Sequence, residues 1–354
     1  MTRRIASLPP LATLVLLAAC TGPGTSLLPT TGTSSPAAEP TAVATPSEPT
    51  QLKVGLGYIP SVQFAPFYLA EQRGYYRDAG LAVTFENKID PDLVTLVGQG
   101  ALDVGLADGT SVIPAVSQGI PIRYLATVYG TYPSVVFAKE GDIETAADLE
   151  GKRIGIPGRF GSSWIMLQAL LQSVDLTPED VTIVEYPDFG QWVAVMENAV
   201  AAATGFVNNE PVLLELAEGN DVVVLQIDDV VALPGPGLIA GTGTIATKGA
   251  AISAFRDVTL RAMREIAADP EAGLEAAFTA VPELADEHGY QDIILERTIA
   301  AWAAPGSGPA EYGTLNRAGW QASIEFMMGL GLVPNPVTVD DLLWEAGTPP
   351  PVQG

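Results

Sequence analysis

The sequence has very few of the residues that most enzymes use for catalysis. Its 354 residues include one cysteine, Cys20, and one histidine, His288. A disulfide within the chain is therefore excluded, and so is a zinc site built from several cysteines and histidines. A Ser-His-Asp or Cys-His arrangement would depend on His288, which we expect at the surface of a helical region. We predict no catalytic residues, no metal and no cofactor.

Positive charge is also scarce. The chain has 17 Lys and Arg against 41 Asp and Glu, a formal net charge of −24. Nucleic-acid binding needs clustered positive charge, and anionic membrane surfaces attract basic segments, so neither is an expected partner. Hydrophobic residues at 47% and charged residues at 16% are typical of a folded chain with a sizeable core. At about 150 residues per domain, the length suggests two domains.

The N-terminus has the pattern of a secretory signal over residues 1–19. Arg3 and Arg4 precede an apolar run that ends in Leu17-Ala18-Ala19, directly before Cys20. The run is too short for a membrane span of about 20 residues. This end resembles the lipobox of bacterial lipoproteins, which implies lipidation (palmitate) at Cys20 and a lipid anchor on the extracytoplasmic side of the cell membrane. An ordinary signal peptide with an incidental cysteine is the alternative.

The rest of the chain divides into a tether and a folded body. Residues 20–50 are rich in Pro, Ser, Thr, Ala and Gly and are expected to form a flexible tether. Short apolar strands and helices then alternate, and the pattern restarts near Leu149. This alternation predicts an α/β fold with mainly parallel sheets, in two lobes. From Ile252 onward the pattern is mostly helical.

Several motifs in the body occur in a specific order. They are Val54-Gly55-Leu56-Gly57-Tyr58-Ile59-Pro60, Phe64-Ala65-Pro66-Phe67-Tyr68-Leu69-Ala70, Gly74-Tyr75-Tyr76, Ala79-Gly80-Leu81, Leu102-Asp103-Val104-Gly105 after Gly98, and Asp148-Leu149 before Gly151-Lys152 and Ile154-Gly155. Together they resemble the solute-binding lipoproteins of ABC importers in the group that binds thiamine pyrimidines, riboflavin, sulfonates or nitrate. The resemblance covers residues 52 to about 340.

The resemblance implies an α/β fold of the periplasmic-binding-protein type II, with two lobes joined by a two-strand hinge. We expect lobe I at 51–135 and 246–354 and lobe II at 136–245, with crossings near Pro133–Ala138 and Ile239–Ala246. The ligand would lie in the cleft, and hinge closure would present a monomeric protein to the permease subunits and their ATPase.

In open α/β sheets ligands gather beyond the carboxyl ends of strands, so residues just after each strand are candidates. Aromatic rings there offer stacking faces, and amides, hydroxyls and carboxyls offer hydrogen bonds. The predicted ligand-binding residues are Tyr58, Gln63, Phe64, Asp108, Thr110, Tyr129, Gly161, Ser162, Trp164, Trp192, Asn208 and Glu210. Further candidates after the strands are Phe67, Gly109, Tyr132, Arg159, Phe160, Ser163, Phe189, Gln191 and Asn209. The set favours a neutral, planar ligand with a polar edge.

Some candidates have a purely structural alternative. Tyr58, Phe64 and Trp192 fit a core as well as a cleft. The run Asn208-Asn209-Glu210 is also a typical N-cap cluster.

An anionic ligand is a further alternative. Gly161-Ser162-Ser163 opens a helix, where backbone N–H groups and the helix dipole bind anions, and Arg159 is near in sequence. Arg159 is equally expected to be a solvated surface residue. Asp108 and Glu210, with no second cation, disfavour a sulfonate or nitrate.

These observations predict a vitamin-binding protein, with riboflavin as the first choice of ligand. A flavin needs more stacking surface than a single pyrimidine, and Tyr129 and Tyr132 near the hinge add to it. The thiamine pyrimidine precursor, formylaminopyrimidine or hydroxymethylpyrimidine, is the second choice. A signalling lipoprotein that reports the vitamin is a third. Yeast pyrimidine synthases share the general fold but carry a cysteine-rich motif and an active-site histidine, whereas this chain has no cysteine after Cys20.

Overall fold

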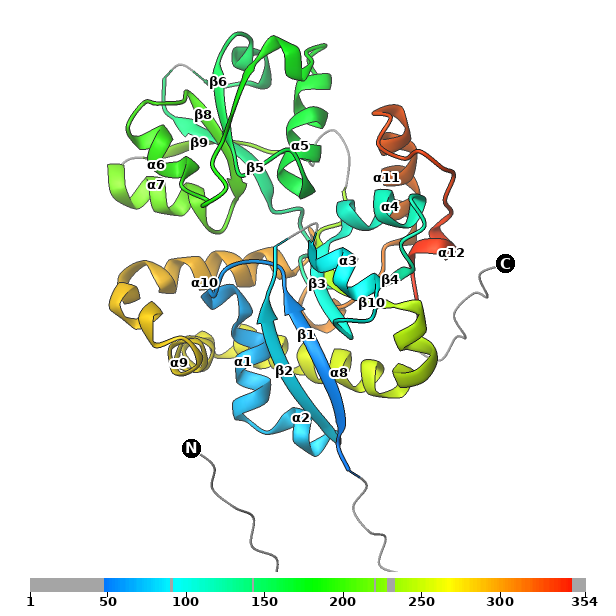
Figure 1. The fold of residues 1–354 in the computed structure, drawn as a ribbon. Helices are drawn as coiled ribbons and strands as arrows, with labels where there is room; N and C mark the ends of the chain where they lie inside the picture. The colour runs from blue at the N-terminus through cyan, green and yellow to red at the C-terminus, as the bar shows by residue number, and fades with distance from the viewer. Residues whose placement is uncertain (1–47, 90–91, 142, 220, 228–232, 346–354) are drawn as a thin grey trace, which may run out of the picture. The chain divides into compact units, whose positions relative to one another are not determined.

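Two five-stranded mixed sheets organise the part of the chain that the structure describes (Figure 1). The structure is a computed structural model, and it describes residues 48–89, 92–141, 143–219, 221–227 and 233–345. All of these residues belong to one compact unit. The predicted signal peptide, Cys20 and nearly all of the predicted tether lie outside the described residues.

The first sheet has the strand order β2-β1-β3-β10-β4, with β10 antiparallel to both of its neighbours. Its strands are β1 (Thr50–Leu56), β2 (Leu81–Asn87), β3 (Val104–Asp108), β4 (Ile122–Thr127) and β10 (Pro236–Gly241). Alternate residues point to opposite faces of a strand. Accordingly Leu238 and Ala240 pack into one hydrophobic cluster, and Ile239 packs into another on the opposite face.

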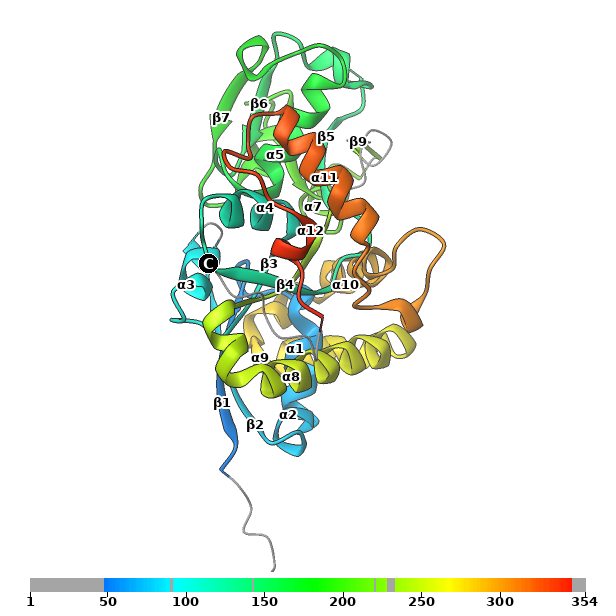
Figure 2. The same ribbon diagram turned by 90° about the vertical axis from the view of Figure 1, so that its right-hand side faces the viewer.

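Helices cover both faces of the first sheet. One face packs on α1 (Ala65–Gln72), α2 (Tyr75–Asp78), α8 (Thr242–Ala268), α9 (Pro270–Ala280) and α10 (His288–Trp302). The other packs on α3 (Asp92–Gly98), α4 (Gly109–Ser117), α11 (Arg317–Gly329) and α12 (Val339–Leu342). Figure 2 shows α11 and α12 beside α4. We call this sheet and its helices the first half. The side chain of His288 is outside the described residues.

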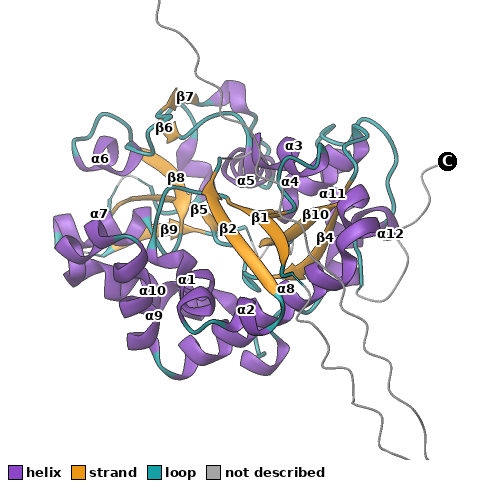
Figure 3. Cartoon of the chain, turned by 60° about the horizontal axis from the view of Figure 1, so that its bottom comes forward, coloured by secondary structure: helices purple, strands orange, loops and turns teal. Residues whose placement is uncertain are grey.

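The second sheet has the order β7-β6-β8-β5-β9 and forms the second half with its helices. Its strands are β5 (Ser134–Lys139), β6 (Arg153–Ile156), β7 (Thr182–Glu185), β8 (Ala202–Phe206) and β9 (Val222–Leu225). One face packs on α5 (Gly161–Gln172), and the other packs on α6 (Gln191–Met196) and α7 (Glu210–Glu218). Figure 3 shows both sheets flanked by helices.

The chain crosses between the sheets after β4 and again between β9 and β10. The predicted boundary at residue 245 is wrong, because β10 pairs with β3 and β4 in the first sheet and not with the second. Residues 242–245 are already in α8. The predicted first crossing at Pro133–Ala138 also lies too far along the chain, because most of that segment is strand β5 of the second sheet.

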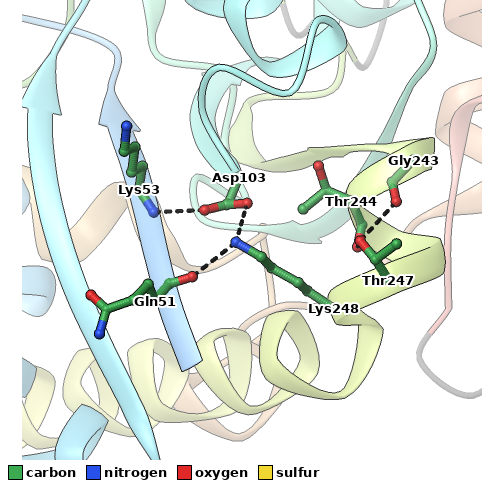
Figure 4. Close-up of polar contacts among 7 residues, drawn as sticks. All are labelled: Gln51, Lys53, Asp103, Gly243, Thr244, Thr247 and Lys248. Carbon is green, nitrogen blue, oxygen red and sulfur yellow. Dashed lines mark hydrogen bonds and ion pairs between the residues drawn. The ribbon is translucent and has the colours of Figure 1, made fainter. Parts of the chain in front are cut away.

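Helix α8 is interrupted at Lys248, whose backbone leaves the helical region (φ −124°, ψ 19°). At this point the Lys248 ammonium forms an ion pair with Asp103 at 2.8 Å and donates to the Gln51 carbonyl at 2.9 Å (Figure 4). The other carboxyl oxygen of Asp103 accepts the Lys53 N–H at 2.9 Å. Asp103 therefore ties the loop before β3 to β1 and to α8, far along the chain.

Among the described residues, no helix combines the length and the apolar character that crossing a membrane requires.

Candidate functional site

A pocket lies between the two halves, at the ends of strands from both sheets. Its empty volume is about 830 Å³, including the part open to solvent. The residues that line it are Gly57, Tyr58, Gln63, Phe64, Ile89, Leu106, Ala107, Asp108, Tyr129, Pro157, Phe160, Gly161, Ser162, Ser163, Phe189, Gln191, Gly205, Phe206, Asn209, Glu210 and Pro236.

The topology explains why these residues meet. Strands β1 and β3 run parallel in the first sheet, and β6 runs parallel to β7 and β8 in the second. Loops at the carboxyl ends of parallel strands share one edge of a sheet. Tyr58 and Asp108 lie at that edge of the first sheet, and Phe160, Phe189 and Phe206 lie at that edge of the second.

Tyr58 connects the two halves across one side of the pocket. Its hydroxyl accepts a hydrogen bond from Asn209 Nδ2 at 3.0 Å and donates to Glu210 Oε1 at 3.4 Å. Its ring packs edge-on against Phe189, with centroids 4.8 Å apart. Burial raises the pKa of the Tyr58 hydroxyl, and the nearby Glu210 carboxyl raises it further. Tyr58 therefore stays protonated and can both donate and accept.

Glu210 is buried at the start of α7, with 5% of its surface exposed. Its second carboxyl oxygen accepts the Phe206 N–H at 2.9 Å. Burial raises the pKa of Glu210 above its ordinary value, and the hydrogen bonds from Phe206, Tyr58 and Asn209 only partly oppose this. A carboxyl in such a place can hold its proton and act as a neutral donor.

Asp108 connects the halves on another side of the pocket. It lies at the end of β3, and its Oδ2 accepts the Ser162 N–H of α5 at 3.3 Å. Burial raises the pKa of Asp108, opposed in part by hydrogen bonds from Ser162. The Ser162 carbonyl in turn accepts the Tyr132 hydroxyl at 3.1 Å. The first turn of α5 is thus held by Asp108 of the first half and by Tyr132 of the segment that crosses between the sheets.

Two amide side chains complete the polar lining. Gln63 Oε1 accepts the Tyr129 hydroxyl at 3.2 Å. Gln191 Nε2 donates to the Thr204 carbonyl at 3.0 Å, which fixes the orientation of the amide. Gln191 Oε1 has no hydrogen-bond partner among the described residues. Buried polar atoms are normally paired, so this oxygen is an exception, in a side chain that lines the pocket.

The pocket lining is aromatic, acidic and without positive charge. None of the described residues in the lining is Lys, Arg or His. Arg159 directly precedes the lining residue Phe160 in the sequence. It forms an ion pair with Glu185 at 3.2 Å and lies over the Trp164 ring at 5.3 Å. No group of three or more His, Cys, Asp or Glu among the described residues is placed to hold a metal ion.

The structure brings together most of the predicted site residues. Those that line the pocket are Tyr58, Gln63, Phe64, Asp108, Tyr129, Gly161, Ser162 and Glu210. Thr110, Trp164, Trp192 and Asn208 do not line it. Thr110 and Asn208 are fully buried, where Thr110 pairs with Tyr132 at 3.3 Å and Asn208 Nδ2 donates to Thr298 at 2.8 Å. Trp164 and Trp192 pack against the two hydrophobic clusters of the second half.

Other lining residues were weaker candidates in the sequence or were missed. Phe160, Ser163, Phe189, Gln191 and Asn209 follow strands and were considered on that ground. Ile89, Leu106, Pro157, Phe206 and Pro236 were missed. Phe206 ends β8, and its ring packs edge-on to Tyr129 with centroids 6.4 Å apart. Phe206 was not predicted because it lies within a strand, whereas the candidates were residues that follow strands.

Comparison with known proteins connects this architecture to a family. Residues 61–273 match the family described as NMT1/THI5 like. The chain is 33% identical over 334 residues to the riboflavin-binding protein RibY of Chloroflexus aurantiacus, covering 92% of each chain. It is 30% identical over 189 residues to the 4-amino-5-hydroxymethyl-2-methylpyrimidine phosphate synthase THI11 of Saccharomyces cerevisiae, covering 50% of this chain and 54% of that one.

Solved structures show the same fold at lower identity. The alkanesulfonate-binding protein SsuA from Xanthomonas axonopodis pv. citri, bound to MOPS, matches with a TM-score of 0.66 at 20% identity, covering 85% of this chain and all of that one (100%). The Candida albicans CA3427 gene product, described as having the generic periplasmic binding protein fold, matches with a TM-score of 0.64 at 15% identity, covering 86% and 99%. The predicted fold class, the periplasmic-binding-protein type, is confirmed.

Proposed function

The chain belongs to the NMT1/THI5-like family, and on that premise we propose that it binds a planar, uncharged vitamin between its two halves, with riboflavin as the first choice. The observation that carries this proposal is the lining of the pocket. Aromatic side chains from both halves line it together with polar side chains, and positive charge is absent from the described lining.

The lining suits the parts of a flavin. The isoalloxazine ring has two flat faces and an edge of alternating donors and acceptors. Phe64 of the first half and Phe160 of the second offer faces for stacking, worth about 0.5–1.5 kcal/mol per pair beyond area burial. Gln191 Oε1 is an unpaired acceptor for a ring N–H. Asp108, Asn209 and Glu210 are partners for the ribityl hydroxyls. The relative RibY, named for riboflavin binding, supports the same choice.

Isothermal titration of the purified protein with riboflavin tests the proposal. We expect saturable binding, and we expect flavin fluorescence to be quenched by the rings in the pocket. Phe160→Ala should weaken binding, whereas Trp164→Ala, which also removes an aromatic ring but outside the lining, should not. Riboflavin that gives neither heat nor quenching with a folded protein would refute this choice of ligand.

The thiamine pyrimidine precursor is the second candidate, supported by the similarity to pyrimidine phosphate synthases. A single ring would fill less of the aromatic lining. Titration with hydroxymethylpyrimidine or formylaminopyrimidine, alone and in competition with riboflavin, separates the two. Displacement of bound flavin by a pyrimidine at lower concentration would reverse the order. Sulfonate and nitrate are weaker candidates because the described lining offers no cation.

We further propose that the protein delivers its ligand to an ABC permease and performs no catalysis. The two-half architecture, with the pocket between the halves, supports a role in capture and release. Incubation of the bound ligand with the protein should return it chemically unchanged by mass spectrometry. A new product would favour a synthase.

Lipid anchoring at Cys20 is a separate proposal, supported by the lipobox pattern alone. Metabolic labelling of the full-length protein with a palmitate analogue should modify the wild type and not Cys20→Ser. The wild type should fractionate with membranes on the extracytoplasmic side. Equal labelling of both forms would contradict the assignment.

A further inference from the structure

Helix α5 begins at the pocket without a cap from its own segment. Its N-cap residue, Phe160, has no side-chain acceptor for the first N–H groups, and the next residue, Gly161, adopts a positive φ of 63°. The helix is 12 residues long. Unpaired N–H groups and the aligned peptide dipoles make such an end favourable for anions.

A carboxyl from the opposite half occupies this end. Asp108 Oδ2 accepts the Ser162 N–H at 3.3 Å. A Cβ placed on Gly161 would lie 3.7 Å from the same oxygen, so the carboxyl sits directly over the first turn. Asp108 reaches this position from the end of β3 in the first sheet, and is not part of the α5 segment.

We propose that Asp108 is a specificity-determining residue, whose carboxyl fills the anion-binding end of α5 and thereby keeps sulfonate, sulfate and phosphate groups out of the pocket. The inference deepens the proposed function, on which it rests for the identity of the binding site. Occupation of this space does not depend on the proton, because both carboxyl oxygens remain in place in either state.

The surrounding side chains add to this exclusion. Glu210 is a second acid in the lining, and no Lys, Arg or His stands among the described lining residues to neutralise an incoming anion. Arg159, two residues before Gly161, is engaged by Glu185 at 3.2 Å. An oxyanion would therefore have to displace Asp108 to reach the N–H groups of α5.

Three variants separate occupation of the helix end from net charge. Asp108→Ala removes the acid and empties the space. Asp108→Asn removes the acid but keeps the volume. Glu210→Gln removes the other acid of the same pocket. Ethanesulfonate is the probe, titrated calorimetrically at low ionic strength, with thermal melting to establish folding. Asp108→Ser replaces Asp108→Ala if the latter does not fold.

We expect Asp108→Ala to bind ethanesulfonate at least tenfold more tightly than the wild type, Asp108→Asn and Glu210→Gln. An equal gain in Glu210→Gln would show that charge alone excludes anions and would overturn the proposal. So would tight ethanesulfonate binding by the wild type, or no gain in a folded Asp108→Ala. Failure of the wild type to bind riboflavin in the separate titration would overturn the proposed ligand and leave this comparison standing.

Discussion

The two halves build their sides of the pocket in different ways. In the first half, Gln63 and Phe64 lie in a short 3-10 helix (Val62–Phe64) and are buried, and Gln63 is bonded to Tyr129. In the second half, Gly161 and Phe189 have positive φ angles of 63° and 62°. Such a conformation in a phenylalanine costs on the order of 1–3 kcal/mol and tends to occur at functional sites. The first half therefore presents side chains held by packing, whereas the second presents two turns with positive φ, of which the one at Phe189 stores strain.

The largest effect is expected from adding a side chain at Gly205 in the second half, where strand β8 passes close to Glu210. A Cβ at Gly205 would lie 2.8 Å from Glu210 Cβ and 2.9 Å from its Oε2. Gly205→Val should displace Glu210 and Phe206, reduce ligand affinity about 100-fold or more, and cost about 1–3 kcal/mol of stability. Titration calorimetry and urea unfolding measure the two effects. Gly243→Ala, in open space in the first half, is the control.

A smaller effect is expected from the contact between the halves. Tyr58→Phe removes the hydroxyl that Asn209 and Glu210 share across the pocket, at an expected cost of about 1–1.5 kcal/mol, or roughly tenfold in affinity. Tyr76→Phe is the matched control, because the Tyr76 hydroxyl pairs with Thr259 inside the first half at 3.1 Å.

Small-angle scattering of the ligand-free protein distinguishes these two tyrosines. Tyr58→Phe should enlarge the radius of gyration, since the contact between the two halves loses the hydrogen bonds of the Tyr58 hydroxyl. Tyr76→Phe should lower stability without changing the dimensions. Identical scattering from the wild type, Tyr58→Phe and Tyr76→Phe would show that the Tyr58 hydroxyl does not hold the two halves together.

The third effect concerns pH. Burial raises the pKa of Glu210 above 4.5 in the folded protein. Above pH 4.5 the unfolded chain loses this proton while the folded chain still holds it, so stability should fall as pH rises through the raised pKa. Glu210→Gln should flatten the fall in melting temperature over that range. An unchanged slope would show that Glu210 is not the group responsible.

Asp148 has a pKa shift in the opposite direction to that of Glu210. Its pKa is lowered by hydrogen bonds from Thr145 and from the Glu144 N–H, at the start of a short 3-10 helix (Ala146–Leu149) in the second half. The stability that Asp148 contributes is present above pH 3.8, the ordinary pKa of the group, and is lost as the pH falls through its lowered pKa. Asp148→Asn should therefore lower the melting temperature at neutral pH and make little difference at acid pH, where the wild type has already lost this contribution.

The smallest effect is expected far from the pocket. Lys248→Met removes the ion pair with Asp103, whose two side chains are 34% and 13% exposed. Partly exposed pairs contribute little, so a loss of about 1 kcal/mol or less is expected, with no change in ligand affinity. Chemical unfolding measures the stability, and a weakened ligand affinity would show that this tie reaches the pocket.

The sequence predicted the two sheets and much of the pocket because these depend on local patterns. Strand and helix periods are local, and residues after parallel strands meet at one edge. The pairing of β10 is not local. Its ladder joins Pro236 to Asp108 and Gly237 to Thr127, more than one hundred residues earlier. An apolar run such as Leu238–Gly241 fits a central strand of either sheet equally well, so the boundary was misplaced.

The missed side chains also have a physical reason. Consecutive helical residues point about 100° apart, so two neighbours can face different surroundings. In α6, Gln191 lines the pocket and Trp192 packs into the core. After β8, Asn209 lines it and Asn208 is buried. Position after a strand identified the right segments in each case, but the rotation of each segment is set by packing against the rest of the molecule.

The position of β10 also bears on the order in which the protein folds. In the first sheet, β4 pairs with β10 and with a single bridge at Leu343, both of which follow the whole second half in the chain. During synthesis, β5 to β9 can pair among themselves while β4 still lacks its partners. The first half therefore starts to form before the second half but is completed after it. The edge of β4 stays unpaired until β10 has been synthesised.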